Sequence, residues 1–207
     1  MPAESNPKLP VDFHHSRFTQ ISESHCGPAV IQMLLSNLGI EVSQEAVASA
    51  GGAANLIALN GMRVDQLARA VRLLAPQAQF WCKDHATPSD LSRLVNDFQT
   101  PVGVEWQGLF EDRLEDESEE GDYGHYSAVI IVDEDNGQVV IADPYKDFRN
   151  QDRIFSLGWF VTRWYDFNEV EDAKTGRRRT VEDRRLLFII TPADKTFPRE
   201  LGMRNNV

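Results

Sequence analysis

Cys26 stands directly before an apolar run with helical spacing, in the stretch QISESHCGPAVIQMLLSNLG that covers residues 20–39. Gly27 and Pro28 follow it, and proline suits the first turn of a helix, where its missing N–H has no partner in any case. A thiol at a helix N-terminus faces the positive end of the backbone dipole, which favours the nucleophilic thiolate. Because Gly27 lacks a Cβ, a substrate backbone can come close to the sulfur. Cys26 is therefore a candidate nucleophile.

A possible partner for this chemistry is Gln20, six residues before Cys26. Attack of a thiolate on an acyl group builds negative charge on the carbonyl oxygen, and that oxygen needs hydrogen-bond donors already in place. The Gln20 amide and the Cys26 backbone N–H would supply two such donors. Taken alone, Gln20 would be read as a surface glutamine, so this role depends on the residues that accompany it.

A thiolate nucleophile usually works with a histidine. Of the five histidines, we select His125 because it opens the apolar run HYSAVIIVD. Gly124 directly precedes it, and we predict that Gly124 and Gly27 are substrate-binding positions. Asp143 ends the run QVVIAD, and Pro144 stops the strand there because it has no N–H. The Asp143 carboxylate would accept the second ring N–H of His125 and fix its tautomer. A simple hairpin does not place these two residues opposite each other, so the prediction requires a bulge, a strong twist or a strand curl.

In this order the four residues resemble the catalytic set of the papain-like cysteine peptidases that cleave bacteriocin leaders after a double glycine. In that family a Gln lies six residues before the Cys of a Cys-Gly-x-Ala-x-x-x-Met stretch, matched here by Gln20, Cys26, Gly27, Ala29 and Met33. A later His opens an apolar strand and an Asp-Pro follows, matched by His125 and by Asp143-Pro144. The segment NGMRVDQLARAV is also similar, and the resemblance covers roughly residues 16–165.

The resemblance implies a papain-like fold and a thiol hydrolase of peptide or amide bonds that needs no cofactor. Cys26 would attack, His125 would act as base and then as acid, Asp143 would orient it, and Gln20 would hold the oxyanion. The family often has Asp before the Cys, where this chain has His25.

Three alternatives to a hydrolase remain open. An acyltransferase would use the same thiol chemistry with an amine as acceptor, and a peptidase-like domain could bind a peptide without cutting it. A zinc site is disfavoured because two of its ligands would be adjacent in the chain, a spacing that suits chelation poorly. Its residues would be His25, Cys26, Cys82 and His85.

The elements that must position these residues change character along the chain. Apolar spacing and caps predict helices at residues 26–38, 43–52, 64–75 and 87–98. β-branched and aromatic runs predict strands at residues 78–82, 101–106, 125–133, 138–143, 157–167 and 184–191, with a hairpin turn at EDNG. The sequence therefore predicts an α+β fold, a helical N-terminal half packed on an antiparallel sheet, with the site in the crevice between them.

Two charged segments stand apart from these elements. Residues 111–122 are strongly acidic and lead into His125, so they are either a solvated loop or a lid that favours a basic peptide. Residues 174–185 are basic and read as a hairpin tip around Gly176. We divide the chain into an N-terminal arm (1–15), one peptidase domain (16–195) and a C-terminal tail (196–207).

Composition narrows the class of partner. The chain has 207 residues and a formal net charge of −11, which argues against nucleic acid or an anionic membrane as the main partner. The N-terminus has neither a basic start nor an apolar stretch, so we expect a cytoplasmic protein without a secretory signal. Cys26 and Cys82 are expected to be free thiols in a reducing compartment. The sequence does not predict the oligomeric state.

Overall fold

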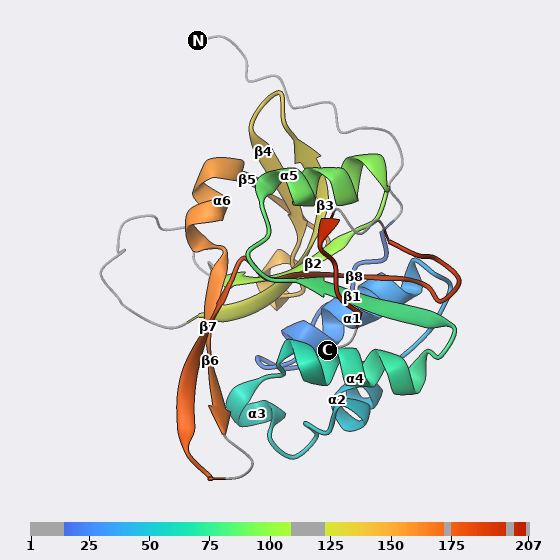
Figure 1. Ribbon diagram of the computed structural model, residues 1–207, viewed down its shortest axis with the longest axis vertical. Coiled ribbons are helices and arrows are strands. Elements are labelled where there is room, and N and C mark those ends of the chain that lie inside the picture. The colour runs from blue at the N-terminus through green and yellow to red at the C-terminus, as the bar shows by residue number, and fades with distance from the viewer. Residues whose placement is uncertain (1–14, 109–122, 172–174, 198–200, 206–207) are drawn as a thin grey trace.

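Six antiparallel strands form the central sheet of the protein (Figure 1). The computed structural model describes residues 15–108, 123–171, 175–197 and 201–205. The strand order is β1-β8-β2-β3-β4-β5. The strands are β1 (Ala78–Lys83), β2 (Val102–Gln107), β3 (Gly124–Asp133), β4 (Gln138–Ala142), β5 (Asp152–Ser156) and β8 (Leu187–Pro192). Of these, β5 was not predicted, whereas strands over the other five runs were.

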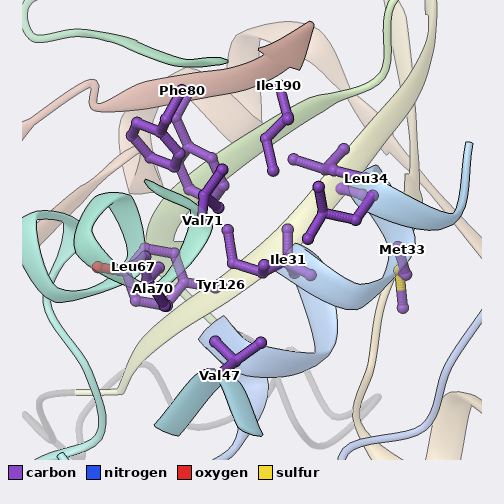
Figure 2. Close-up of a cluster of buried hydrophobic side chains, with 14 of the residues drawn as sticks. Ile31, Met33, Leu34, Val47, Leu67, Ala70, Val71, Phe80, Tyr126 and Ile190 are labelled. Atoms are coloured by element: carbon purple, nitrogen blue, oxygen red, sulfur yellow. The ribbon is translucent and has the colours of Figure 1, made fainter. Parts of the chain in front are cut away.

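The N-terminal helices cover one face of this sheet. They are α1 (Cys26–Ser36), α2 (Gln44–Gly51), the short α3 (Ile57–Asn60) and α4 (Val64–Leu74). Figure 2 shows the core between these helices and the sheet, where Ile31 of α1 and Val71 of α4 lie in one cluster with Phe80, Tyr126 and Ile190 from the strands. Because α1 is buried along most of its length, its first residue is held in a fixed position.

Local caps explain why the helices begin where the sequence predicts. The Ser43 side chain accepts the backbone N–H of Ala46 at 3.1 Å and starts α2. Thr87 caps α5 (Pro88–Ser92), and Pro88 occupies its first turn, as predicted. The predicted helix continues as a π-helical turn, η1 (Arg93–Asp97), which packs on the opposite face of the sheet from α1.

The prediction of a strand at residues 157–167 was wrong over most of its length. Residues Leu157–Arg163 form the helix α6, and the strand β6 (Tyr165–Glu171) begins only after it. Phe160 in α6 and Trp164 directly after it are both fully buried, in the hydrophobic cluster on the sheet face opposite α1. Ser156 caps the helix by accepting the Trp159 N–H. Burial of one helical face outweighs the preference of aromatic residues for strands.

A separate two-stranded hairpin projects from the sheet (Figure 1). It pairs β6 with β7 (Arg178–Arg184), and Gly176 lies between the strands with a φ of +64°. Gly176 thus lies between the two strands of a hairpin, as predicted, and residues 178–184 of the basic segment form its second strand. The acidic segment 111–122 lies outside the described residues, and so does most of the arm. The domain boundaries stay a prediction. Within the described residues, no helix combines the length and apolar character needed to cross a bilayer.

Candidate active site

Cys26 is the first residue of α1, as the sequence predicts, and its side chain is largely buried. The preceding residue, His25, caps the helix without a side-chain bond to it, and its Nδ1 lies 2.6 Å from the Ser22 hydroxyl instead. Cys26 therefore belongs to the first helical turn, whose backbone N–H groups favour negative charge nearby.

His125 meets Asp143 across the sheet, with Nε2 2.8 Å from the carboxylate Oδ1. A β-bulge at Ile130 makes this possible by shifting the β3–β4 register by one residue. Beyond the bulge Ala128 pairs with Ala142, so Asp143 falls opposite the residue two positions from His125, on the same face of β3. Without the extra residue, Asp143 would oppose the residue three positions away, whose side chain points to the other face.

The His125 ring also hydrogen-bonds with the Cys26 thiol. Since Nε2 faces Asp143, Nδ1 is the nitrogen left for the sulfur. Burial alone would lower the pKa of His125, but the Asp143 carboxylate and the Cys26 sulfur outweigh it and raise the pKa to about 10. At neutral pH the ring is then an imidazolium that lies between the Asp143 carboxylate and the Cys26 sulfur.

Three donors surround the Asp143 carboxylate. Oδ1 accepts from His125 and from the Tyr145 backbone N–H (3.0 Å), whereas Oδ2 accepts from Arg153 Nη1 at 2.8 Å. Burial works against the charged form, but these partners outweigh it and hold the pKa of Asp143 below its ordinary value. Arg153 was not predicted from the sequence, because its strand, β5, gave no recognisable signal.

Gln20 is buried in the loop before Cys26. Its backbone N–H donates to the carbonyl of Pro144 (2.8 Å), which ties this loop to the residue after Asp143. Its side-chain Nε2 donates to the Ser22 carbonyl (2.8 Å), and an amide nitrogen carries a second hydrogen. The loop itself is anchored by Gln44, whose amide donates to Thr19 and accepts from the Ile21 N–H.

The two predicted substrate-binding glycines face different surroundings. Gly27 is buried, and a Cβ there would lie 3.2–3.3 Å from side-chain atoms of Leu67 and Tyr126, so a larger residue would need these side chains to shift by a few tenths of an ångström. Gly124 is exposed, and a Cβ there would clash with the Asp166 carboxylate. Only Gly124 lines the same cleft as Cys26. A role in substrate binding stays a prediction for both.

The cleft beside Cys26 has a volume of about 520 Å³. Leu59 of α3 and Leu56, the residue before that helix, contribute to its lining, and β6 contributes Asp166 and Phe167. The apolar side chains are exposed, with 53%, 79% and 45% of Leu56, Leu59 and Phe167 accessible. Exposed apolar groups next to the candidate nucleophile form a surface that an extended peptide could cover. Among the described residues, no group of His, Cys, Asp and Glu side chains is placed to hold a metal ion.

The model of the Peptidase_C39 like family matches residues 14–171. Among solved structures, the peptidase domain of Streptococcus ComA, a bifunctional ABC transporter involved in a quorum-sensing pathway, is similar, with a TM-score of 0.58 and 19% identity. The likeness covers 86% of this chain and 99% of that domain, and it confirms the expected papain-like fold. No curated protein matches the chain.

Proposed function

Because the chain belongs to the Peptidase_C39 like family, which supports a function of the cysteine peptidase type, we propose that it hydrolyses peptide or amide bonds through Cys26, His125 and Asp143. The observation that carries the proposal is the continuous contact from the Cys26 thiol through the His125 ring to the Asp143 carboxylate. Such a chain of contacts activates a nucleophile and also supplies a proton to the leaving group.

In the first half of the reaction, the Cys26 thiolate attacks the carbonyl carbon of the scissile bond. The oxyanion receives hydrogen bonds from the Cys26 N–H and from the second hydrogen of Gln20 Nε2. As the C–N bond breaks, the His125 imidazolium passes its Nδ1 proton to the leaving amine. A thioester at Cys26 and a neutral His125 result.

In the second half, neutral His125 takes a proton from a water molecule while the oxygen of that water attacks the carbonyl carbon of the thioester. The C–S bond breaks, the carboxylic acid leaves and the thiolate–imidazolium pair is restored. Asp143 stays ionised throughout and stabilises the imidazolium each time it forms. Its buried position and low pKa support that role.

The test is thiol reactivity followed by product analysis on the full chain. Iodoacetamide should alkylate Cys26 well below pH 8, whereas Cys82 should stay inert because burial raises its pKa to about 11. A library of unmodified peptides should then yield cleavage products with the wild-type protein and none with Cys26→Ala. Equal reactivity of the two thiols, or cleavage that survives Cys26→Ala, would contradict the proposal. Transfer to an added amine in place of water would identify an acyltransferase.

A further inference from the structure

Arg153 is a buried arginine directly behind the candidate triad. Only 8% of the residue is exposed, and its strand β5 pairs with β4 so that Arg153 lies opposite Ile141, two residues before Asp143. Its Nη1 donates to Asp143 Oδ2 at 2.8 Å. Burying the charge of an arginine costs free energy, and that cost must be compensated by its contacts. The hydrogen-bond partner and the packing of Arg153 therefore indicate its role.

The packing fixes the plane of the Arg153 guanidinium. Its Cζ lies 3.7 Å from the centre of the Phe148 ring and 4.8 Å from the centre of the Phe155 ring. These contacts suit the flat, delocalised guanidinium and would not suit the compact ammonium of lysine equally well. The two oxygens of the Asp143 carboxylate thus have different partners, because Oδ2 binds the Arg153 guanidinium, whereas Oδ1 accepts from His125 and the Tyr145 N–H.

We propose that Arg153 is a positioning residue, which holds the Asp143 carboxylate ionised and turned toward His125. The inference rests on the proposed function. Arg153 does not line the cleft beside Cys26, so it acts on the nucleophile only through Asp143 and His125. Two charged partners, His125 from β3 and Arg153 from β5, act on the carboxylate from opposite sides of the β4 strand end.

The charge of Arg153 has a predictable effect on the pH dependence of Cys26. Removing a cation raises the proton affinity of each neighbouring group, so Asp143 and the thiol–imidazole pair should all hold their protons to higher pH. The acid limb of the alkylation profile should therefore move upward. Arg153 contacts Asp143 and not the thiol–imidazole pair, and it contributes least among the partners that lower the pKa of Asp143. We therefore expect a displacement of up to about one pH unit, which is an up to roughly tenfold lower rate at a given pH on that limb.

The experiment compares iodoacetamide alkylation of Cys26 from pH 4 to 10 in the full-length wild type, Arg153→Gln, Arg153→Lys and Arg149→Gln. Arg153→Gln keeps a donor for Asp143 but loses the charge, and Arg153→Lys keeps the charge but not the planar stacking. Arg149 lies nearby but is exposed, so Arg149→Gln removes the same charge as a matched control. Thermal unfolding of each variant reports whether packing has been lost.

The proposal is supported if Arg153→Gln moves the acid limb upward, Arg153→Lys moves it less, and Arg149→Gln leaves it in place. It is overturned if a folded Arg153→Gln keeps the wild-type profile and loses only thermal stability. If Arg153→Gln does not fold, the test depends on Arg153→Lys, which keeps the charge. A displacement of its acid limb by a full pH unit would then show that the charge of Arg153 is not what sets the profile. An unreactive Cys26 in the wild type would instead refute the proposed function itself.

Discussion

At the scale of single residues, the candidate site depends on the balance of charge around His125. Burial opposes the imidazolium, and the Asp143 carboxylate together with the Cys26 sulfur reverses that effect and raises the pKa of His125 to about 10. A protonated, fully buried ring at neutral pH depends here on its two neighbours, the Asp143 carboxylate and the Cys26 sulfur. The identity of residue 143 should therefore control the reactivity of a sulfur that it does not touch.

Asp143→Asn should slow alkylation of Cys26 at pH 7 by at least about tenfold. Without the carboxylate, burial dominates, the pKa of His125 falls, and the thiolate loses its imidazolium. The measurement is the rate of iodoacetamide labelling at Cys26 against pH. Asp147→Asn serves as control, because that exposed carboxyl lies four residues along the chain. An unchanged labelling rate in Asp143→Asn would show that the ring is not held charged by Asp143.

The residues of the candidate site could be predicted from the sequence better than the residues that hold them in place. Cys26, His125 and Asp143 could be selected because each has a local signal, namely a helix start, a strand start and an Asp-Pro strand end. Arg153 and Gln44 have no such signal. Their importance comes from contacts made across 10 and 25 residues, to Asp143 and to Thr19, which exist only after the sheet and helices have packed.

At the scale of elements, irregular backbone decides whether the residues meet. Caps at Ser43 and Thr87 were readable from the sequence because each acts on its own helix. The bulge at Ile130 was not, since nothing in the apolar run HYSAVIIVD distinguishes the one residue that leaves the ladder. The strand prediction at α6 failed for the same reason. Aromatic residues occur in both helices and strands, and here the packing of the core determines that they form a helix.

The loop that carries Gln20 offers a test at this scale. Gln44, at the start of α2, binds the Thr19 carbonyl at 2.9 Å and the Ile21 N–H at 3.0 Å, and is itself buried. Gln44→Leu leaves both backbone groups without these partners and should lower the free energy of unfolding by about 1–3 kcal/mol. Urea unfolding measures this change.

If Gln20 donates to the oxyanion, Gln44→Leu should also reduce peptide cleavage more than it reduces alkylation of Cys26, because alkylation needs no oxyanion hole. Gln77→Leu, at an exposed position, is the matched control for the substitution. Equal stability of Gln44→Leu and Gln77→Leu would show that the loop is held by other contacts.

At the scale of the whole molecule, a second buried acid affects stability without belonging to the triad. Glu105 of β2 is 1% exposed. Burial, followed by the charge of Asp166, raises its pKa well above the ordinary value. The charge of Asp183 adds to this effect, and the hydrogen bonds with Tyr126 and then Asn168 oppose it. The folded protein therefore binds a proton at Glu105 that the unfolded chain releases near pH 4.5.

The sign of the resulting pH dependence follows from linkage. A carboxyl that is more strongly protonated in the folded state stabilises the fold fully below its unfolded pKa, and this contribution is lost as the pH rises from about 4.5 toward the folded pKa.

Glu105→Gln removes the titration while keeping the shape of the side chain. It should therefore raise the free energy of unfolding at pH 8 by at least about 1 kcal/mol relative to wild type, and the two proteins should converge toward pH 4. Thermal and urea unfolding across this range, with the exposed Glu134→Gln as control, measure the difference. A Glu105→Gln variant that is less stable than wild type at pH 8 would mean that the buried carboxyl is ionised and held by its neighbours, contrary to the direction of its pKa.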